Sequence, residues 1–162
     1  MVSPTVEAAL IVVSVALSIF GAWACIRDTV AGRTKPNRVS WFLWAAAPMI
    51  GAAAAASAGA DLSSYARTLL AGIMPGLVFL ASFYNPQSYW KTTWFDIVCG
   101  ITAVLALVAW VLAESPRAAI VLSATADGFA SIPTIVKAWR HPETETGTIY
   151  VTTLVSVKRP KK

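Results

Sequence analysis

Residues 97–113 read IVCGITAVLALVAWVLA, a run of 17 positions without a charged side chain. A helix rises about 1.5 Å per residue and the hydrocarbon core of a bilayer is about 30 Å thick, so this run is typical of a membrane span. A shorter run, 146–157, stops before a basic tail at 158–162. Four more runs of spanning length occur elsewhere: 8–26, 39–60 and 68–90, which are uncharged, and 118–136, in which the one charged residue is Asp127.

The composition supports the same class of protein. Hydrophobic residues make up 57% of the chain and charged residues 13%, whereas a soluble domain carries about a quarter charged residues. We therefore expect an all-α, polytopic transmembrane bundle that forms a single membrane domain over 1–162 and has the lipid bilayer as its partner. The net charge of +5 does not indicate nucleic-acid binding, because the basic residues lie between the apolar runs rather than on one face.

The distribution of Lys and Arg predicts the topology. If the short sixth run does not cross, 11 of the 13 Lys and Arg residues lie on one side; if it crosses, the division is 7 against 6. Cytoplasmic loops carry the excess of Lys and Arg. We therefore predict five full spans plus a partial sixth in a cell membrane, with the N-terminus outside and the C-terminus in the cytoplasm.

The first and fifth runs lead into similar segments at an offset near 109 residues. Each has an apolar helix, a basic end, a short polar loop with proline, and an aromatic residue at the start of the next segment. The spacing predicts a parallel repeat. Its parts are a first three-helix repeat at 6–90, a linker span at 92–113 and an incomplete second repeat at 118–157.

The residues of these two segments resemble a known motif. Pro133 is followed by Thr134, by Lys137 four residues after the proline, and by Glu145 twelve residues after it; Ala24 takes the aligned proline position in the first run. This pattern resembles the PQ-loop superfamily, which includes the SWEET sugar transporters, and a group of uncharacterised prokaryotic membrane proteins within or near it. The loop residues that carry the motif are Lys35, Pro36, Asn37, Trp41, Lys137 and Glu145.

The resemblance implies two three-helix repeats joined by a linker helix, and transport of a small solute by alternating access. By this plan the chain lacks most of span six and all of span seven. If the reading frame ends at residue 162, pairing between two copies would supply the missing helices, so a homo-oligomer is an expected form.

Asp127 is the most distinctive polar residue. It lies near the middle of the fifth run, where an acidic side chain costs about 2.5–3.5 kcal/mol and is expected to face protein or water. No basic residue lies in the middle of a run, so we expect no ion-pair partner for it in this chain. The polar stripe at helical spacing, with its counterparts in the first run, comprises Ser123, Asp127, Ser131, Thr134, Ser14 and Ser18. This stripe either lines a pathway for a solute or a proton, or holds neighbouring helices together by hydrogen bonds.

Other residues carry less specific expectations. Pro48, Pro75 and Pro133 mark kinks that are either hinges or only structural. Asn37 is expected to cap the second span, and His141 to be a solvated loop residue. The sequence shows no catalytic constellation and no metal-ligand or cofactor motif, so we expect neither an enzyme nor a metal protein.

Two functions follow from these observations. One is a carrier for a small polar solute, with a site at the midplane on the fifth span. The other is a membrane protein that does not transport, such as a scaffold, an assembly factor or a receptor-like module.

Overall fold

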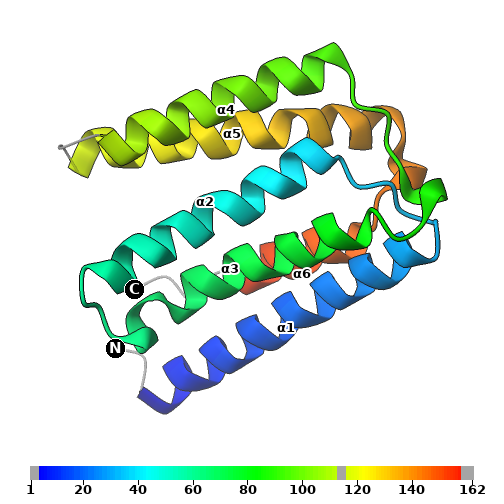
Figure 1. Ribbon diagram of the computed structural model, residues 1–162. Helices are drawn as coiled ribbons and strands as arrows, with labels where there is room; N and C mark the ends of the chain where they lie inside the picture. Colours follow the sequence, from blue (N-terminus) through cyan, green and yellow to red (C-terminus); the bar gives the residue numbers. More distant parts are fainter. Residues whose placement is uncertain (1–3, 113–115, 158–162) are drawn as a thin grey trace.

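The computed structural model of the protein describes residues 4–112 and 116–157, which contain helices and no strands. Successive helices run in opposite directions, so that α1, α3 and α5 finish at the same end of the bundle (Figure 1). The elements are α1 (Pro4–Val30), α2 (Arg38–Ser57), α3 (Leu62–Ala81), the short 3-10 helix η1 (Pro86–Ser88), α4 (Trp94–Leu112), α5 (Pro116–Arg140), the 3-10 helix η2 (Pro142–Thr144) and α6 (Gly147–Val157).

Among the described residues, four helices are long and apolar enough to cross a membrane: α1 over Val12–Val30, and the whole of α2, α3 and α4. The all-helical architecture predicted from the sequence is confirmed, and these four helices fit an integral membrane protein. The prediction of five full spans is supported for four. The fifth, α5, carries the polar stripe around Asp127, which lowers its hydropathy.

The third helix begins earlier and ends earlier than predicted. The uncharged run covers 68–90, but α3 covers Leu62–Ala81, and residues 82–93 form a loop that contains η1. The uncharged run continues past the end of the helix because Asn85 and the following proline favour a turn, and the Asn85 side chain caps η1 by accepting from the Gln87 backbone N–H at 2.9 Å. Because α3 begins at Leu62, Arg67 lies within the second turn of the helix instead of in a loop.

The helices pack against their neighbours in the chain and also, crosswise, against helices farther along it. α3 packs against both α1 and α2, and α4 packs against α5, the next helix in the chain. α1 also packs against α6, while α2 packs against α5. Under the predicted repeat, α1 corresponds to α5 and α2 to α6, so each half of the bundle makes the same kind of contact with the other half.

An aromatic residue near the start of α2 lies in the core. Only 3% of Trp41 is exposed, because α2 begins at Arg38 and places Trp41 one turn inside the helix. Its indole packs against Cys25 of α1 and Val78 of α3, and it meets the Trp44 ring edge to face at a centroid distance of 5.4 Å.

Glycine permits the closest helix contact. A Cβ atom on Gly72 of α3 would lie 2.9 Å from the Ala45 carbonyl oxygen and 3.1 Å from the Met49 backbone nitrogen, both on α2. Backbone atoms cannot move aside as a flexible side chain can. Small residues at helix interfaces in membranes allow this kind of approach.

We predict that Gly72→Ala forces α2 and α3 apart and lowers the free energy of unfolding by about 1–3 kcal/mol. Unfolding in detergent micelles would measure the change. Gly128→Ala is the matched control, since a Cβ atom there has no neighbour within 4 Å. An equal effect of the two substitutions would show that the contact between α2 and α3 is not tight.

Candidate functional site

We call the end of the bundle where α1, α3 and α5 finish the basic end; it comprises the loops 31–37, 82–93 and 141–146 with the adjoining helix ends. The opposite end, where α3 and α5 begin, is called the far end (Figure 1). Polar contacts tie the helices together at the basic end, and a charged hollow lies between helices toward the far end.

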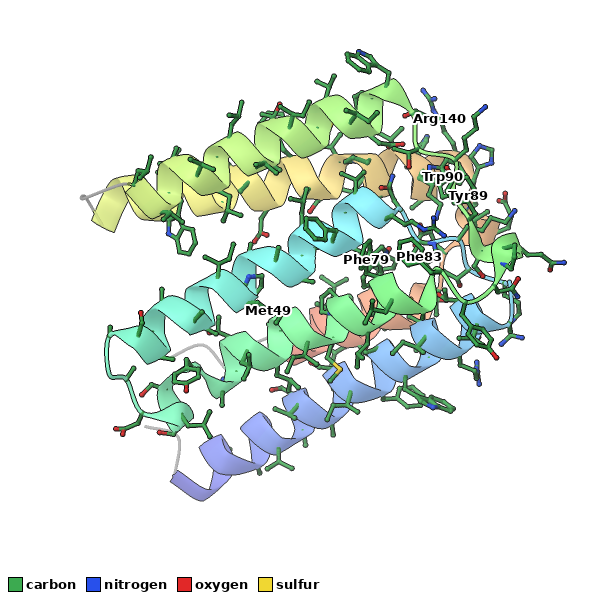
Figure 2. The ribbon with its side chains drawn as sticks, in the orientation of Figure 1. Met49, Phe79, Phe83, Tyr89, Trp90 and Arg140 are labelled. Carbon is green, nitrogen blue, oxygen red and sulfur yellow. The ribbon has the colours of Figure 1, made fainter. Side chains whose placement is uncertain are left out.

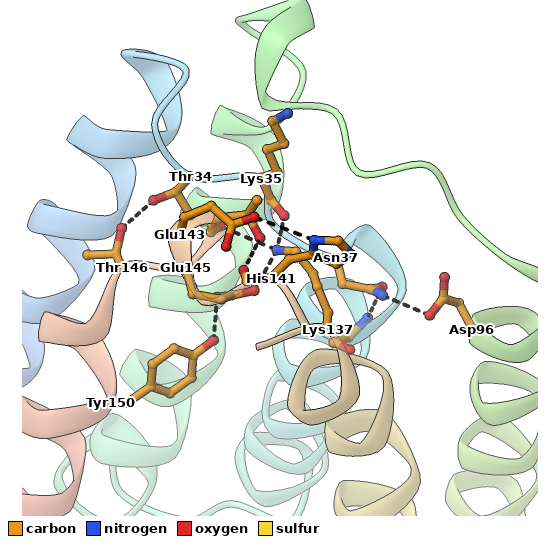
Figure 3. A network of polar contacts seen from close by, with 12 residues as sticks. Thr34, Lys35, Asn37, Asp96, Lys137, His141, Glu143, Glu145, Thr146 and Tyr150 are labelled. Atoms are coloured by element: carbon orange, nitrogen blue, oxygen red, sulfur yellow. Dashed lines mark hydrogen bonds and ion pairs between the residues drawn. The ribbon is translucent and has the colours of Figure 1, made fainter. Parts of the chain in front are cut away.

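Lys137 is the centre of the basic end (Figure 3). Its side chain is 1% exposed and its ammonium lies 2.5 Å from the carboxylate of Glu145, which is 6% exposed. The ammonium also donates to the backbone carbonyls of Lys35 and Thr144, and it lies 5.1 Å from the centre of the Trp90 ring. An ammonium has three donors, so these three acceptors satisfy it fully.

The surroundings of this ion pair come from both halves of the protein. Burial lowers the pKa of the Lys137 ammonium, and the adjacent Glu145 carboxylate opposes that shift. The second oxygen of Glu145 accepts from the Tyr150 hydroxyl at 2.8 Å. Lys35 belongs to the loop after α1, so the lysine of the second half holds the loop of the first half.

Asp28 makes the reciprocal contact. Its carboxylate accepts from Arg33 at 2.6 Å and from Arg27 at 3.1 Å, and it accepts from the Thr146 hydroxyl at 3.2 Å. Thr146 in turn shares a hydrogen bond with Thr34. Asp28 and Lys137 are 109 positions apart, which is the offset of the predicted repeat. Asp28 of the first half binds the loop of the second half, and Lys137 of the second half binds the loop of the first half.

The Lys35 backbone N–H donates to the Thr144 carbonyl at 2.9 Å. These two residues are also 109 positions apart. The two loops therefore meet at residues that the predicted repeat makes equivalent. An internal two-fold axis between the halves would bring equivalent residues together in this way.

Asn37 joins α2 to α4. Its side-chain oxygen accepts from the backbone N–H of Val39 and of Ser40, which confirms the predicted cap of α2. Its amide nitrogen donates to Asp96 at 3.0 Å. Asp96 also accepts from the Thr93 backbone at 2.7 Å at the start of α4, so a single buried carboxylate links the first turns of two helices.

Arg38 joins α2 to the end of α3. Its guanidinium donates to the Ser82 carbonyl at 2.7 Å and to the Ser82 hydroxyl at 3.1 Å. It also lies 4.0 Å from the centre of the Phe83 ring and 4.8 Å from that of Tyr89, at the same end as Trp90 (Figure 2). Cation–π contact of this kind suits an arginine that is only partly exposed.

Toward the far end, a hollow of about 400 Å³ lies between α2, α3, α4 and α5. Residues from all four helices line it: Ala47, Pro48, Gly51, Arg67, Thr68, Ala71, Leu107, Trp110, Ala126 and Asp127. Apart from two charged side chains and one hydroxyl, these residues are apolar or small. The volume is in the range of pockets that bind small molecules.

Arg67 and Asp127 are both exposed and line the same hollow, although no ion pair joins them. We expected no basic residue within reach of Asp127, because Arg67 precedes the third uncharged run and was therefore expected in a loop. Because α3 begins at Leu62, Arg67 lies on the helix and lines the hollow opposite α5. Within the described part of the chain, neither side chain has a hydrogen bond or a salt bridge, including with the other.

The other residues of the predicted stripe lie in different surroundings. The Ser131 hydroxyl donates to the Asp127 carbonyl in its own helix at 2.7 Å. Thr134 is 2% exposed, and its buried hydroxyl has no partner in the described part. The side chain of Ser123 lies outside the residues that are described in detail.

Ser14 and Ser18 lie on α1, which packs against α3 and α6. Ser18 donates to the Ser14 carbonyl at 2.8 Å in the same helix. Asp127 lies on α5, which packs against α4 and α2. A shared pathway from α1 to α5 stays a prediction, as does the hinge role of Pro48, Pro75 and Pro133, which lie inside α2, α3 and α5.

His141 is half exposed, as expected of a loop residue, and its ring lies 3.4 Å from the Glu143 carboxylate. Among the described residues, no group of three or more His, Cys, Asp and Glu side chains is placed to hold a metal ion.

Sequence reasoning missed Arg67, Asp96 and Tyr150 as parts of these sites. A signal for Arg67 was present, because Gly59 and Asp61 together mark the end of one helix and the start of the next. Gly59 has φ +79° after α2, and Asp61 occupies the N-cap position of α3. That signal places Arg67 in the second helical turn.

Comparisons with protein families, curated proteins and solved structures give no match for this chain.

We predict that Lys137→Met lowers the free energy of unfolding by about 3–5 kcal/mol, because it leaves a buried carboxylate without its counter-charge. Glu145→Gln should have a comparable cost, and the double variant should cost less than the sum of the two. Thermal unfolding in detergent measures all three. Lys91→Met, at an exposed loop position, is the control and should change stability by less than about 0.5 kcal/mol. Additive effects of Lys137→Met and Glu145→Gln would contradict the coupling.

Proposed function

We propose that this protein is a membrane carrier for a small polar solute that works by alternating access between its two halves. The first half is α1 to α3, and the second is α5 and α6 with α4 beside α5. The observation that carries the proposal is the difference between the two ends: a hollow lined by two charged side chains lies toward the far end, while contacts between the halves join the loops at the basic end.

The closed end supports a gate at that position. Lys137 and Asp28 each bind the loop of the opposite half, so separation of the halves would break both sets of contacts together. A buried ion pair is stabilising only while both partners are present and hydrogen-bonded. Lys137 and Glu145 both belong to the second half, so their pairing holds the ammonium in place to bind the Lys35 carbonyl of the first half, and this contact is the one that a gate would break.

The repeat supports motion of one half against the other. The crosswise packing of α1 with α6 and of α2 with α5 relates the halves by the same contacts. Repeat-based carriers alternate by rocking such halves around a site between them. The resemblance of the loop motifs to the PQ-loop superfamily stays a prediction from the sequence.

The charge distribution supports an orientation for the carrier. The basic end carries most of the Lys and Arg residues of the described helices and loops. The positive-inside rule assigns this end to the cytoplasm and the far end to the outside. The conformation of the structure would then be open to the outside and closed to the cytoplasm.

Solvent accessibility of the hollow tests this proposal. In a background in which Cys25 and Cys99 are replaced by Ala, Thr68→Cys would place a thiol in the hollow. In sealed vesicles of known orientation, we predict labelling by a membrane-impermeant thiol reagent from the far end. Glu145→Gln should raise labelling from the basic end by about tenfold, the change expected if the closed state loses about 1.4 kcal/mol.

Val108→Cys on α4 is the control, because Val108 is exposed on the helix surface and does not line the hollow. It should be labelled from neither side in lipid. If the thiol at position 68 reacts from one side only and Glu145→Gln has no effect, the carrier mechanism is wrong, and a non-transporting scaffold becomes the better account.

A further inference from the structure

Within the described part of the chain, two opposite charges without protein partners line one small hollow. Arg67 comes from α3 and Asp127 from α5, so they belong to different halves of the bundle. Charged side chains inside a membrane are costly and are normally paired or placed along a functional pathway. The other ion pairs of the described part lie at the basic end, and none involves either residue.

The positions of the two charges define a direction in the hollow. Arg67 lies in the second turn of α3, whereas Asp127 lies near the middle of α5, and both helices begin at the far end (Figure 1). The cationic group is therefore nearer the far end and the carboxylate is deeper. A bound molecule would lie with its negative group toward the far end and its positive group toward the membrane midplane.

The remaining walls suit an apolar group. Leu107 and Trp110 of α4 line the hollow, and the floor is built from the small residues of α2. A Cβ atom on Gly51 would lie 3.7 Å from the Trp110 indole and 3.9 Å from the Thr68 methyl group. Side chains therefore close around Gly51, and the space of about 400 Å³ admits only a small molecule.

We propose that this hollow binds a small zwitterion of the amino-acid type. Its carboxylate would bind the Arg67 guanidinium, which matches a carboxylate with two parallel hydrogen bonds. Its ammonium would bind the Asp127 carboxylate, and its apolar part would contact Leu107 and Trp110. A neutral sugar would pair with neither protein charge, although both are exposed in the hollow.

This inference names the substrate class of the carrier proposed above and rests on that function for its biological meaning. Binding itself requires only the hollow and the two charges. The two claims can therefore fail separately.

Calorimetric titration of the purified protein in detergent tests the inference. The ligands are the twenty common amino acids, then the decarboxylated amine and the deaminated acid of the tightest of them, and glucose. We expect the zwitterion to bind at least about tenfold more tightly than either truncated analogue, because each analogue leaves one charge of the site without a partner. Glucose should bind no more tightly than the analogues.

Two variants distinguish a zwitterion site from a general polar cavity. Arg67→Gln should weaken zwitterion binding at least about tenfold and abolish the preference over the amine, because both ligands still have an ammonium for Asp127. Asp127→Asn should weaken binding similarly but abolish the preference over the acid. Arg140→Gln, which removes an exposed arginine at the basic end, is the matched control and should leave both preferences unchanged (Figure 2). Thermal unfolding of each variant shows whether it is folded.

The inference is overturned if no amino acid binds, if the analogues bind as tightly as the zwitterion, or if folded Arg67→Gln and Asp127→Asn variants keep both preferences. Glucose binding that these variants do not affect, together with labelling of position 68 from both sides, would leave a carrier without this substrate class. Selective zwitterion binding, with labelling of position 68 from one side only that Glu145→Gln does not change, would leave the inference standing while the carrier function fails.

Discussion

A buried ammonium has to be neutralised and hydrogen-bonded, and the protein meets this requirement at Lys137 with groups from both of its halves. Glu145 supplies the opposite charge, while Lys35 and Thr144 supply backbone carbonyls from the two facing loops. Breaking such a buried pair by removing one partner costs several kcal/mol. The positions of the loops after α1 and α5 therefore depend on this one side chain, and the helices that begin or end at those loops depend on it in turn.

At the opposite end, two charged side chains lack a partner among the described residues, and this difference makes the two ends of the bundle unlike. Arg67 and Asp127 face a hollow without neutralising each other. Lys137 has an acceptor for each of its three donors, whereas the exposed side chains of Arg67 and Asp127 have no partner among the described residues, so a ligand can supply one. Closure of one end and an open, charged hollow at the other are what one conformation of an alternating-access carrier presents.

The features predicted correctly from the sequence are those that depend on local chemistry. The helical runs, the cap by Asn37 and the antiparallel pairing of α4 with α5 follow from hydropathy, from a side chain next to its own helix, and from a short connection. The sequence also identified Lys137 and Glu145 as motif residues. It could not show that the ammonium binds the Lys35 carbonyl, because this contact joins residues 102 positions apart. The position of Arg67 was missed because absence of charge was taken as the boundary of α3, although a helix ends where its backbone is capped and not where its hydropathy changes.

The most direct test of the account is the distance between the two loops at the basic end. Spin labels at Ala31 and Glu143, both exposed, would report this distance in lipid nanodiscs after Cys25 and Cys99 are replaced by Ala. With the Lys137–Glu145 pair intact, we predict a single narrow distribution. In the Glu145→Gln variant, we predict a second population at longer distance, as the halves separate. A distribution that stays unchanged in a folded Glu145→Gln protein would contradict the claim that the Lys137–Glu145 pair positions the ammonium that joins the two halves through the Lys35 carbonyl.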